Sequence, residues 1–193
     1  FLDFSIMCYN QTIKGKSMNI WKDIDEKRVT PQDFVACIEI QQGDKTKYEL
    51  DKETGCLMMD RVLYTSTNYP MNYGFIPLTL SDDGDPLDVF VLCSQPLARL
   101  CLVRCYPIGV VTMTDRDKHE EKIIAIPFGD PQYNEYDDIS KLPKHIFDEL
   151  KHFLSVYKQL ENKVVHVEEL GDHNKAIKII EENLKAYKKA FKK

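Results

Sequence analysis

Carboxylates are crowded in one short segment of the chain. Four aspartates stand within seven residues in Asp82-Asp83-Gly84-Asp85-Pro86-Leu87-Asp88. Like charges at this density repel one another, which costs free energy unless a cation binds them. In a regular strand Asp83 and Asp85 would share one face, while Asp88 would point away. Gly84 and Pro86 interrupt the strand geometry, so a bent loop can bring the three acids together.

Clustered carboxylate oxygens of this kind suit magnesium or manganese. These hard cations bind through a few carboxylates, keep several waters and take further ligands from a substrate phosphate. A calcium-binding EF-hand loop is excluded, because its glycine and its last glutamate do not fall in register from Asp82, Asp83 or Asp85. A solvated acidic turn remains open on this segment alone, since Asp-Gly and Asp-Pro are common turn dipeptides.

A second acidic segment follows an apolar, strand-like run. Met113-Thr114-Asp115 ends this run, and Glu120 and Lys122 come five and seven residues after Asp115, just before the next apolar run. This spacing predicts a β-hairpin that carries two further acids. Taken in isolation, residues 116–121 favour an exposed, charged hairpin tip, and only the combination with the first acidic segment favours a role in a site.

The polar positions together match the pattern of a known family. The segment Asp83-Gly84-Asp85-Pro86-Leu87-Asp88 resembles the signature of the soluble family I inorganic pyrophosphatases, and the length is similar to that of the prokaryote-type members. Further segments in the order and spacing of the family are Cys37-Ile38-Glu39-Ile40, Lys47-Tyr48-Glu49, Asp60-Arg61, Tyr69-Pro70-Met71-Asn72-Tyr73-Gly74, Met113-Thr114-Asp115, Lys122 and Tyr157-Lys158. The resemblance runs from about Trp21 to Phe191.

The resemblance implies an enzyme that uses metal-activated water to hydrolyse inorganic pyrophosphate to two phosphates. The cofactor it implies is Mg²⁺, with Mn²⁺ or another divalent ion as a substitute. The family pattern makes Asp85 the general base and gives as metal ligands Glu49, Asp83, Asp88, Asp115 and Glu120. The residues that would hold phosphate oxygens are Lys47, Arg61, Tyr73, Lys122, Tyr157 and Lys158, and those that would support the site are Glu39, Asp60 and Tyr69. For the three tyrosines, simple core packing is the alternative role.

Glu120 is the clearest departure from the family, because the position five residues after Asp115 is usually aspartate. Glutamate keeps the charge and the oxygen donors but adds a methylene group. Magnesium tolerates little error in its ligand distances of about 2.0–2.1 Å. We therefore expect Glu120 to face the acidic cluster, but at least one metal site to be weaker than an aspartate would make it.

The apolar pattern indicates the elements that must position these residues. Short apolar runs predict strands at residues 34–40, 89–93, 100–111, 123–126 and 164–167. A helical stripe from Pro143 to Leu160 opens with proline in its first turn. Asp172 can cap a last helix with apolar positions at Ala176, Ile177, Ile180, Leu184, Tyr187 and Phe191. The resemblance implies a mainly β, α+β fold: a five-stranded OB-like β-barrel with flanking α-helices.

Length and composition limit the remaining possibilities. We expect one domain over residues 18–193, with 1–17 as an N-terminal extension or processed remnant and Met18 as a candidate natural start. The net charge of −5 disfavours nucleic acid as a partner and means that a polyanionic substrate would need bound cations. With no apolar run of roughly 18 residues and no secretory signal, we expect a cytoplasmic protein without a membrane partner. The resemblance favours a homo-oligomer, a hexamer first and a dimer second.

Three other functions compete with pyrophosphate hydrolysis. A nucleic-acid-binding barrel would need a basic groove, and the acidic clusters argue against one. A metal-binding module without catalysis would require damage at Asp85, Arg61 or a lysine, and all of these residues are present. A phosphatase of broader specificity, acting slowly on longer polyphosphates or nucleotides, is not excluded by the sequence.

Overall fold

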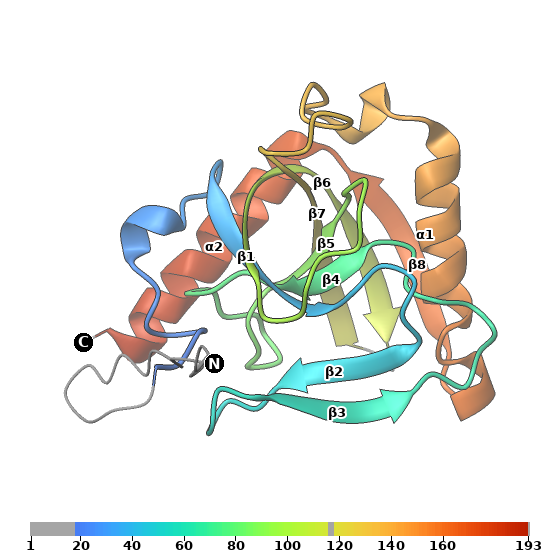
Figure 1. The fold of residues 1–193 in the computed structure, drawn as a ribbon, viewed down its shortest axis with the longest axis horizontal. Helices are drawn as coiled ribbons and strands as arrows, with labels where there is room; N and C mark the ends of the chain where they lie inside the picture. The colour runs from blue at the N-terminus through green and yellow to red at the C-terminus, as the bar shows by residue number, and fades with distance from the viewer. Residues whose placement is uncertain (1–17, 116–117, 193) are drawn as a thin grey trace, which may run out of the picture.

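The computed structural model describes residues 18–115 and 118–192 (Figure 1). The predicted N-terminal extension, residues 1–17, lies outside the described residues. The strands are β1 (Phe34–Ile40), β2 (Thr46–Leu50), β3 (Leu57–Val62), β4 (Asn72–Phe75), β5 (Asp88–Val91), β6 (Leu102–Asp115), β7 (Lys118–Pro127) and β8 (Val165–Gly171). The helices are α1 (Lys144–Val156) and α2 (His173–Phe191), with short 3-10 turns η1 (Glu26–Arg28), η2 (Ile139–Lys141) and η3 (Gln159–Glu161).

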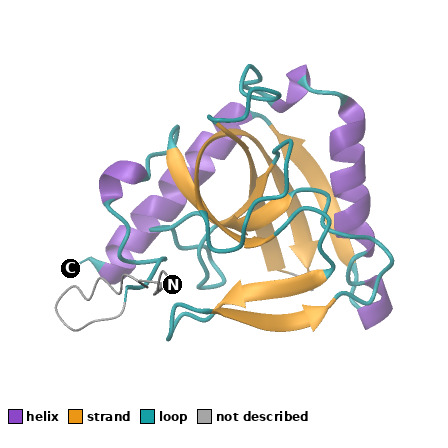
Figure 2. Ribbon diagram, viewed as in Figure 1, coloured by secondary structure: helices purple, strands orange, loops and turns teal. Residues whose placement is uncertain are grey.

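Five strands close into a ring. β1 pairs with β4, β4 with β5 and β6 with β7, all antiparallel, while β5 and β7 pair in parallel. The antiparallel pairing of β1 with β6 then closes the circle, which removes the free edges of an open sheet. β8 extends the sheet beyond β6, and β2 and β3 form a separate two-stranded sheet (Figure 2). The predicted five-stranded barrel with flanking helices is confirmed.

The strands found by their apolar runs are β1, β5, β6, β7 and β8, whereas β2, β3 and β4 were not predicted. β3 has no buried apolar face: its apolar residues Met58, Met59 and Val62 are exposed, and Leu57 is only partly buried. β4 is only four residues long and contains Gly74. β6 also runs four residues past the predicted end at Val111 because its polar end still pairs with β7 and β8.

Successive residues of the central strands enter two different parts of the core. Val89 and Ile123 belong to the part that α2 completes with residues such as Ile180. Phe90 and Ile124 belong to the part that α1 completes. This alternation follows from the two-residue period of a strand and explains why both faces of β5 and β7 are apolar.

Both helices start as predicted, but α1 ends early. Asp172 caps α2, since its carboxylate accepts a hydrogen bond from the Lys175 backbone N–H at 2.8 Å. Pro143 is the N-cap of α1, and the predicted helix to Leu160 stops at Val156. Tyr157 and Lys158 therefore lie at the C-terminal end of the helix rather than within it. In the described part of the chain, no helix has the length and apolar character needed to cross a membrane.

Gly74 is the position where two strands approach most closely. A Cβ atom built there would lie 1.9 Å from the backbone oxygen of Cys37 on β1, so the strands would have to separate. We expect Gly74→Ala to lower the free energy of unfolding by about 3 kcal/mol or more, or to prevent folding. Gly129→Ala is the control, because nothing lies within 4 Å of the added atom. Urea unfolding of both variants tests this, and equal stability would contradict the steric interpretation of Gly74.

Candidate active site

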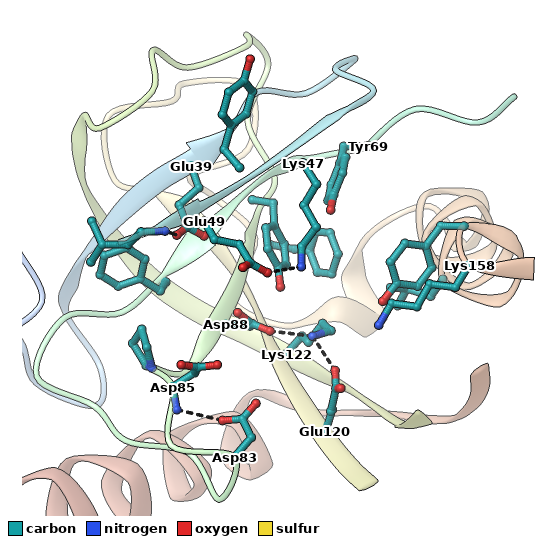
Figure 3. Close-up of a pocket in the computed structure, with 18 of the residues that line it drawn as sticks. Glu39, Lys47, Glu49, Tyr69, Asp83, Asp85, Asp88, Glu120, Lys122 and Lys158 are labelled. Carbon is teal, nitrogen blue, oxygen red and sulfur yellow. Dashed lines mark hydrogen bonds and ion pairs between the residues drawn. The ribbon is translucent and has the colours of Figure 1, made fainter. Parts of the chain in front are cut away.

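One pocket gathers most of the predicted site residues (Figure 3). It lies where four parts of the chain meet: the segment around β5, the first residues of β7, the β2–β3 hairpin and the C-terminal end of α1. The predicted residues that line it are Glu39, Lys47, Glu49, Tyr69, Tyr73, Asp83, Asp85, Asp88, Glu120, Lys122, Tyr157 and Lys158. Asp60, Arg61 and Asp115 do not line it, but each contacts a charged residue of the same network.

The acidic loop before β5 is bent, as its glycine and proline predict. The Ser81 backbone N–H donates to the Asp85 carbonyl at 2.8 Å, and the Gly84 N–H donates to the Ser81 carbonyl at 3.0 Å. Gly84 has φ +88°, a left-handed conformation that favours glycine. The Asp85 N–H also donates to a carboxylate oxygen of Asp83 at 3.0 Å. This turn places Asp83 and Asp85 in the same pocket as Asp88.

Lys122 is a buried cation between two acids. The parallel register of β5 and β7 sets it level with Asp88, and its Nζ lies 2.6 Å from Asp88 Oδ2 and 2.9 Å from Glu120 Oε2. Burial opposes its charge, but the neighbouring carboxylates of Asp88 and Glu120 outweigh burial and raise the Lys122 pKa. Glu120 stands two residues before Lys122 on β7, hence on the same face. Glu120 lines the same pocket as Asp83, Asp85 and Asp88, and its role as a metal ligand stays a prediction.

The β2–β3 hairpin brings a second set of charges to the pocket. Lys47 and Glu49 stand two residues apart on β2, so their side chains lie on the same face of the strand, and they form an ion pair. Asp60 on β3 lies 3.4 Å from the same Lys47 ammonium group. Lys52, in the turn between the strands, pairs with Asp85 and was not predicted. Local spacing carries no signal for that contact, because the fold alone brings the hairpin turn to the acidic loop.

Asp115 reaches the site through Lys158. The two side chains form an ion pair in which both are largely buried. Burial opposes the Lys158 charge, but Tyr157 and Asp115 raise its pKa overall. The second oxygen of Asp115, Oδ1, is buried and has no hydrogen-bond partner among residues 18–115 and 118–192. Such an acceptor suits a cation.

Arg61 is held from two sides. Its Nε donates to Glu161 Oε1 at 2.8 Å, and its Nη1 pairs with Asp60. Its Nη2 is buried and makes no hydrogen bond within the described part of the chain. Glu161 was not predicted, because it is 100 residues from Arg61 in the sequence and no local pattern joins them.

Aromatic rings form one wall of the pocket. The ring centroids of Tyr69 and Phe153 are 4.8 Å apart, those of Phe153 and Tyr157 are 5.2 Å apart, and those of Tyr69 and Tyr73 are 5.5 Å apart. Burial raises the pKa of Tyr69 and of Tyr73 well above the usual range. Both phenols are therefore neutral hydrogen-bond donors at neutral pH, and core packing and site lining coincide in these residues.

Glu39 is a buried acid behind the metal-ligand candidates. Its Oε1 accepts the Leu50 backbone N–H at 2.7 Å, which ties β1 to the end of β2. Burial, and then the negative charge of Asp88, raise the pKa of Glu39 to about 8. This contact fits the supporting role that the sequence predicts for Glu39.

The donor chemistry of the pocket fits a hard divalent cation. Carboxylate oxygens predominate, and Asp115 Oδ1 is an acceptor without a partner among the described residues. No three acidic, histidine or cysteine side chains in the described ranges are arranged to hold a metal ion together. Lysines separate the acids instead: Lys122 lies between Asp88 and Glu120, as Figure 3 shows. Binding of a cation would exchange lysine contacts for metal contacts.

The site is thus a pocket of carboxylates and lysines on a closed five-stranded barrel. The family model described as inorganic pyrophosphatase matches residues 36–188. The chain therefore belongs to the inorganic pyrophosphatase family, whose members are enzymes that hydrolyse pyrophosphate.

Individual relatives agree in length and fold. Soluble inorganic pyrophosphatase 2 of Chlamydomonas reinhardtii is 43% identical over 179 residues, which are 92% of this chain and 93% of that protein. The inorganic pyrophosphatase of Aquifex pyrophilus is 43% identical over 89% of this chain and 99% of its own. The solved structure of the Helicobacter pylori enzyme has a TM-score of 0.79 at 44% identity, covering 82% of this chain and 95% of that one. The Thermus thermophilus structure has a TM-score of 0.84 at 32% identity, with 89% and 99% covered.

The raised pKa of Glu39 predicts a pH-dependent stability. A carboxyl whose pKa is about 8 when folded and near 4.5 when unfolded binds its proton more tightly in the folded protein. The free energy of unfolding therefore falls as the pH rises through this window. We expect Glu39→Gln, which keeps the acceptor for Leu50, to reduce that fall. Urea unfolding at pH 5 and pH 8 in chelator measures it, with exposed Glu53→Gln as control. If the free energy of unfolding fell equally from pH 5 to pH 8 in Glu39→Gln and in wild type, the assignment of this fall to Glu39 would be wrong.

Proposed function

We propose that this enzyme hydrolyses inorganic pyrophosphate in a magnesium-dependent reaction, with Asp85 as the general base. The observation that carries the proposal is the pocket itself, where acids able to bind cations and lysines able to bind phosphate alternate within contact distance. Pyrophosphate with bound divalent ions has the matching alternation of charge. Neither a nucleic-acid-binding groove nor a purely acidic metal site requires acids and lysines to alternate in this way.

The cations would be held by the carboxylates of Glu49, Asp83, Asp88, Asp115 and Glu120. Bound Mg²⁺, or Mn²⁺ in its place, would lower the pKa of an attacking water and neutralise phosphate oxygens. Asp83 and Asp88 support this role because they crowd one another: burial and the Asp88 charge raise the pKa of Asp83. A cation would relieve that repulsion. The weaker metal site expected from Glu120 stays a prediction.

Asp85 is suited to accept the proton from the attacking water. About half of its side chain is exposed, and its cationic contact is Lys52, a flexible side chain that is itself half exposed. Asp88, by contrast, is fixed against buried Lys122. A carboxylate at the solvent side of the pocket can take a proton and release it to bulk water after each turnover.

The cationic and phenolic groups would hold the two phosphates. Lys47, Lys122 and Lys158 each present an ammonium group to the pocket. Phosphate oxygens would replace their carboxylate partners and receive charge-assisted hydrogen bonds. Tyr73 and Tyr157 would add phenolic hydrogen-bond donors, and Arg61 would donate from Nη2. A homo-oligomer, hexamer before dimer, and a cytoplasmic location also stay predictions.

Metal dependence is tested by measuring phosphate release from pyrophosphate. We expect activity with magnesium, loss of activity in excess chelator, and suppression by calcium, whose looser coordination disturbs a near-octahedral site. Restoring magnesium after chelation should restore the rate, which controls for unfolding. Full activity in excess chelator would refute the metal mechanism while leaving family membership intact.

The base assignment is tested by Asp85→Asn. This change keeps the shape of the side chain but removes the proton acceptor, so turnover should fall about 10²–10⁴-fold while folding and most metal binding persist. The pH dependence of kcat should change with it. Asp82→Asn in the same loop is the matched control, because Asp82 does not line the pocket. Unchanged turnover and pH profile in Asp85→Asn would remove Asp85 as the base.

A further inference from the structure

A carboxylate outside the predicted site lies against the active-site arginine. Glu161 is the last residue of η3, the short turn after α1, and only 7% of its side chain is exposed. Figure 1 shows the end of β3, where Arg61 stands, approaching the segment that follows α1. A carboxylate this buried is costly unless its charge is compensated.

Both oxygens of Glu161 are paired. Oε1 accepts from Arg61 Nε at 2.8 Å, and Oε2 accepts from Lys163 Nζ at 2.9 Å. Burial alone would raise the pKa of Glu161, but hydrogen bonds from Lys163 and Arg61 lower it overall. Glu161 is thus ionised at neutral pH and fixed at both ends.

These contacts determine the plane of the Arg61 guanidinium group. Glu161 binds the Nε side of the fork and Asp60 binds Nη1, so the donor left without a protein partner among the described residues is Nη2. A guanidinium group is planar, so two fixed donors also fix the direction of the third. Asp60 and Glu161 do not line the pocket, and neither does Arg61, so both carboxylates hold the guanidinium group from outside the pocket.

The same turn also carries Lys158. The Glu161 backbone N–H donates to the Lys158 carbonyl at 3.0 Å, and the Lys163 N–H donates to that same carbonyl at 3.3 Å. One compact turn therefore presents Lys158 to the pocket and Glu161 to Arg61. Among the described residues, the β2–β3 sheet makes no strand pairing with the barrel, so this ion pair is a link between the hairpin and the end of α1.

We propose that Glu161 is a positioning residue for pyrophosphate hydrolysis, which aims Arg61 Nη2 at a substrate phosphate and holds it in register with Lys158. This inference rests on the proposed role of Arg61 in binding phosphate. Glu161 itself touches neither substrate nor metal. Its removal should therefore affect the reaction only through Arg61.

A double-mutant cycle separates positioning from a general structural effect. The variants are Glu161→Gln, Arg61→Ala and the pair, with kcat and KM for pyrophosphate measured at saturating magnesium. We expect Glu161→Gln to lower kcat/KM about tenfold, through the same parameter that Arg61→Ala changes more strongly. In the Arg61→Ala background, Glu161→Gln should have no further effect. Glu161→Asp, which keeps the charge with a shorter reach, should recover part of the loss.

Controls keep the outcomes distinct. Glu181→Gln removes an exposed ion pair with Lys185 on α2 and should leave the kinetics unchanged. If Glu161→Gln does not fold, the cycle is run with Glu161→Asp, and thermal unfolding is recorded for every variant. Unchanged kcat/KM in a folded Glu161 variant, or an equal loss with and without Arg61, would overturn the inference. Wild-type kinetics in Arg61→Ala would also overturn the inference, because Arg61 would then have no role in binding phosphate. The proposed function is tested independently, by the activity of the wild-type enzyme on pyrophosphate.

Discussion

The parallel pairing of β5 with β7 is the constraint on which the site depends. Alternate residues of β5 and β7 fill two different parts of the core, so a shift by one residue would place each side chain in the wrong part, and this packing fixes the register. That register sets Asp88 level with Lys122, each directly before the apolar run of its strand. A buried ammonium group is tolerated there only because Asp88 and Glu120 flank it. Hydrophobic packing thus decides the position of the central ion pair.

Charge balance then accounts for the rest of the pocket. Each group of acids meets a lysine: Lys122 on β7 pairs with Asp88 and Glu120, Lys158 at the end of α1 pairs with Asp115, and Lys47 on β2 pairs with Glu49. No element carries a complete site. On the proposed function, a metal complex of pyrophosphate would replace these pairs by carboxylate–metal and lysine–phosphate contacts, so that buried charges stay compensated before and after binding.

Local signals explain which features the sequence predicts. The apolar run of β1 and the glycine and proline of the acidic loop act through neighbouring residues, so the strand and the bend were predictable. The end of α1 was not, because the apolar pattern continues to Leu160, whereas in the folded chain α1 ends at Val156 and the separate 3-10 turn η3 follows. Glu161 and Lys52 were missed for a related reason. Their partners lie far away in the sequence, and no periodicity reports a contact made by topology.

Closure of the ring has a consequence for folding. β6 and β7 are neighbours in the chain and can pair early, whereas the seam between β1 and β6 joins Phe34 to Cys105 and has a larger loop-closure cost. β1 and β6, the two strands of this seam, both contribute to the site: Glu39 on β1 lines the pocket, and Asp115 on β6 pairs with Lys158 of the pocket. A partly folded chain with an open seam therefore lacks a complete binding site. Any ligand of the native pocket would favour the closed seam, and its stabilisation would extend to α2, which supplies none of the predicted site residues.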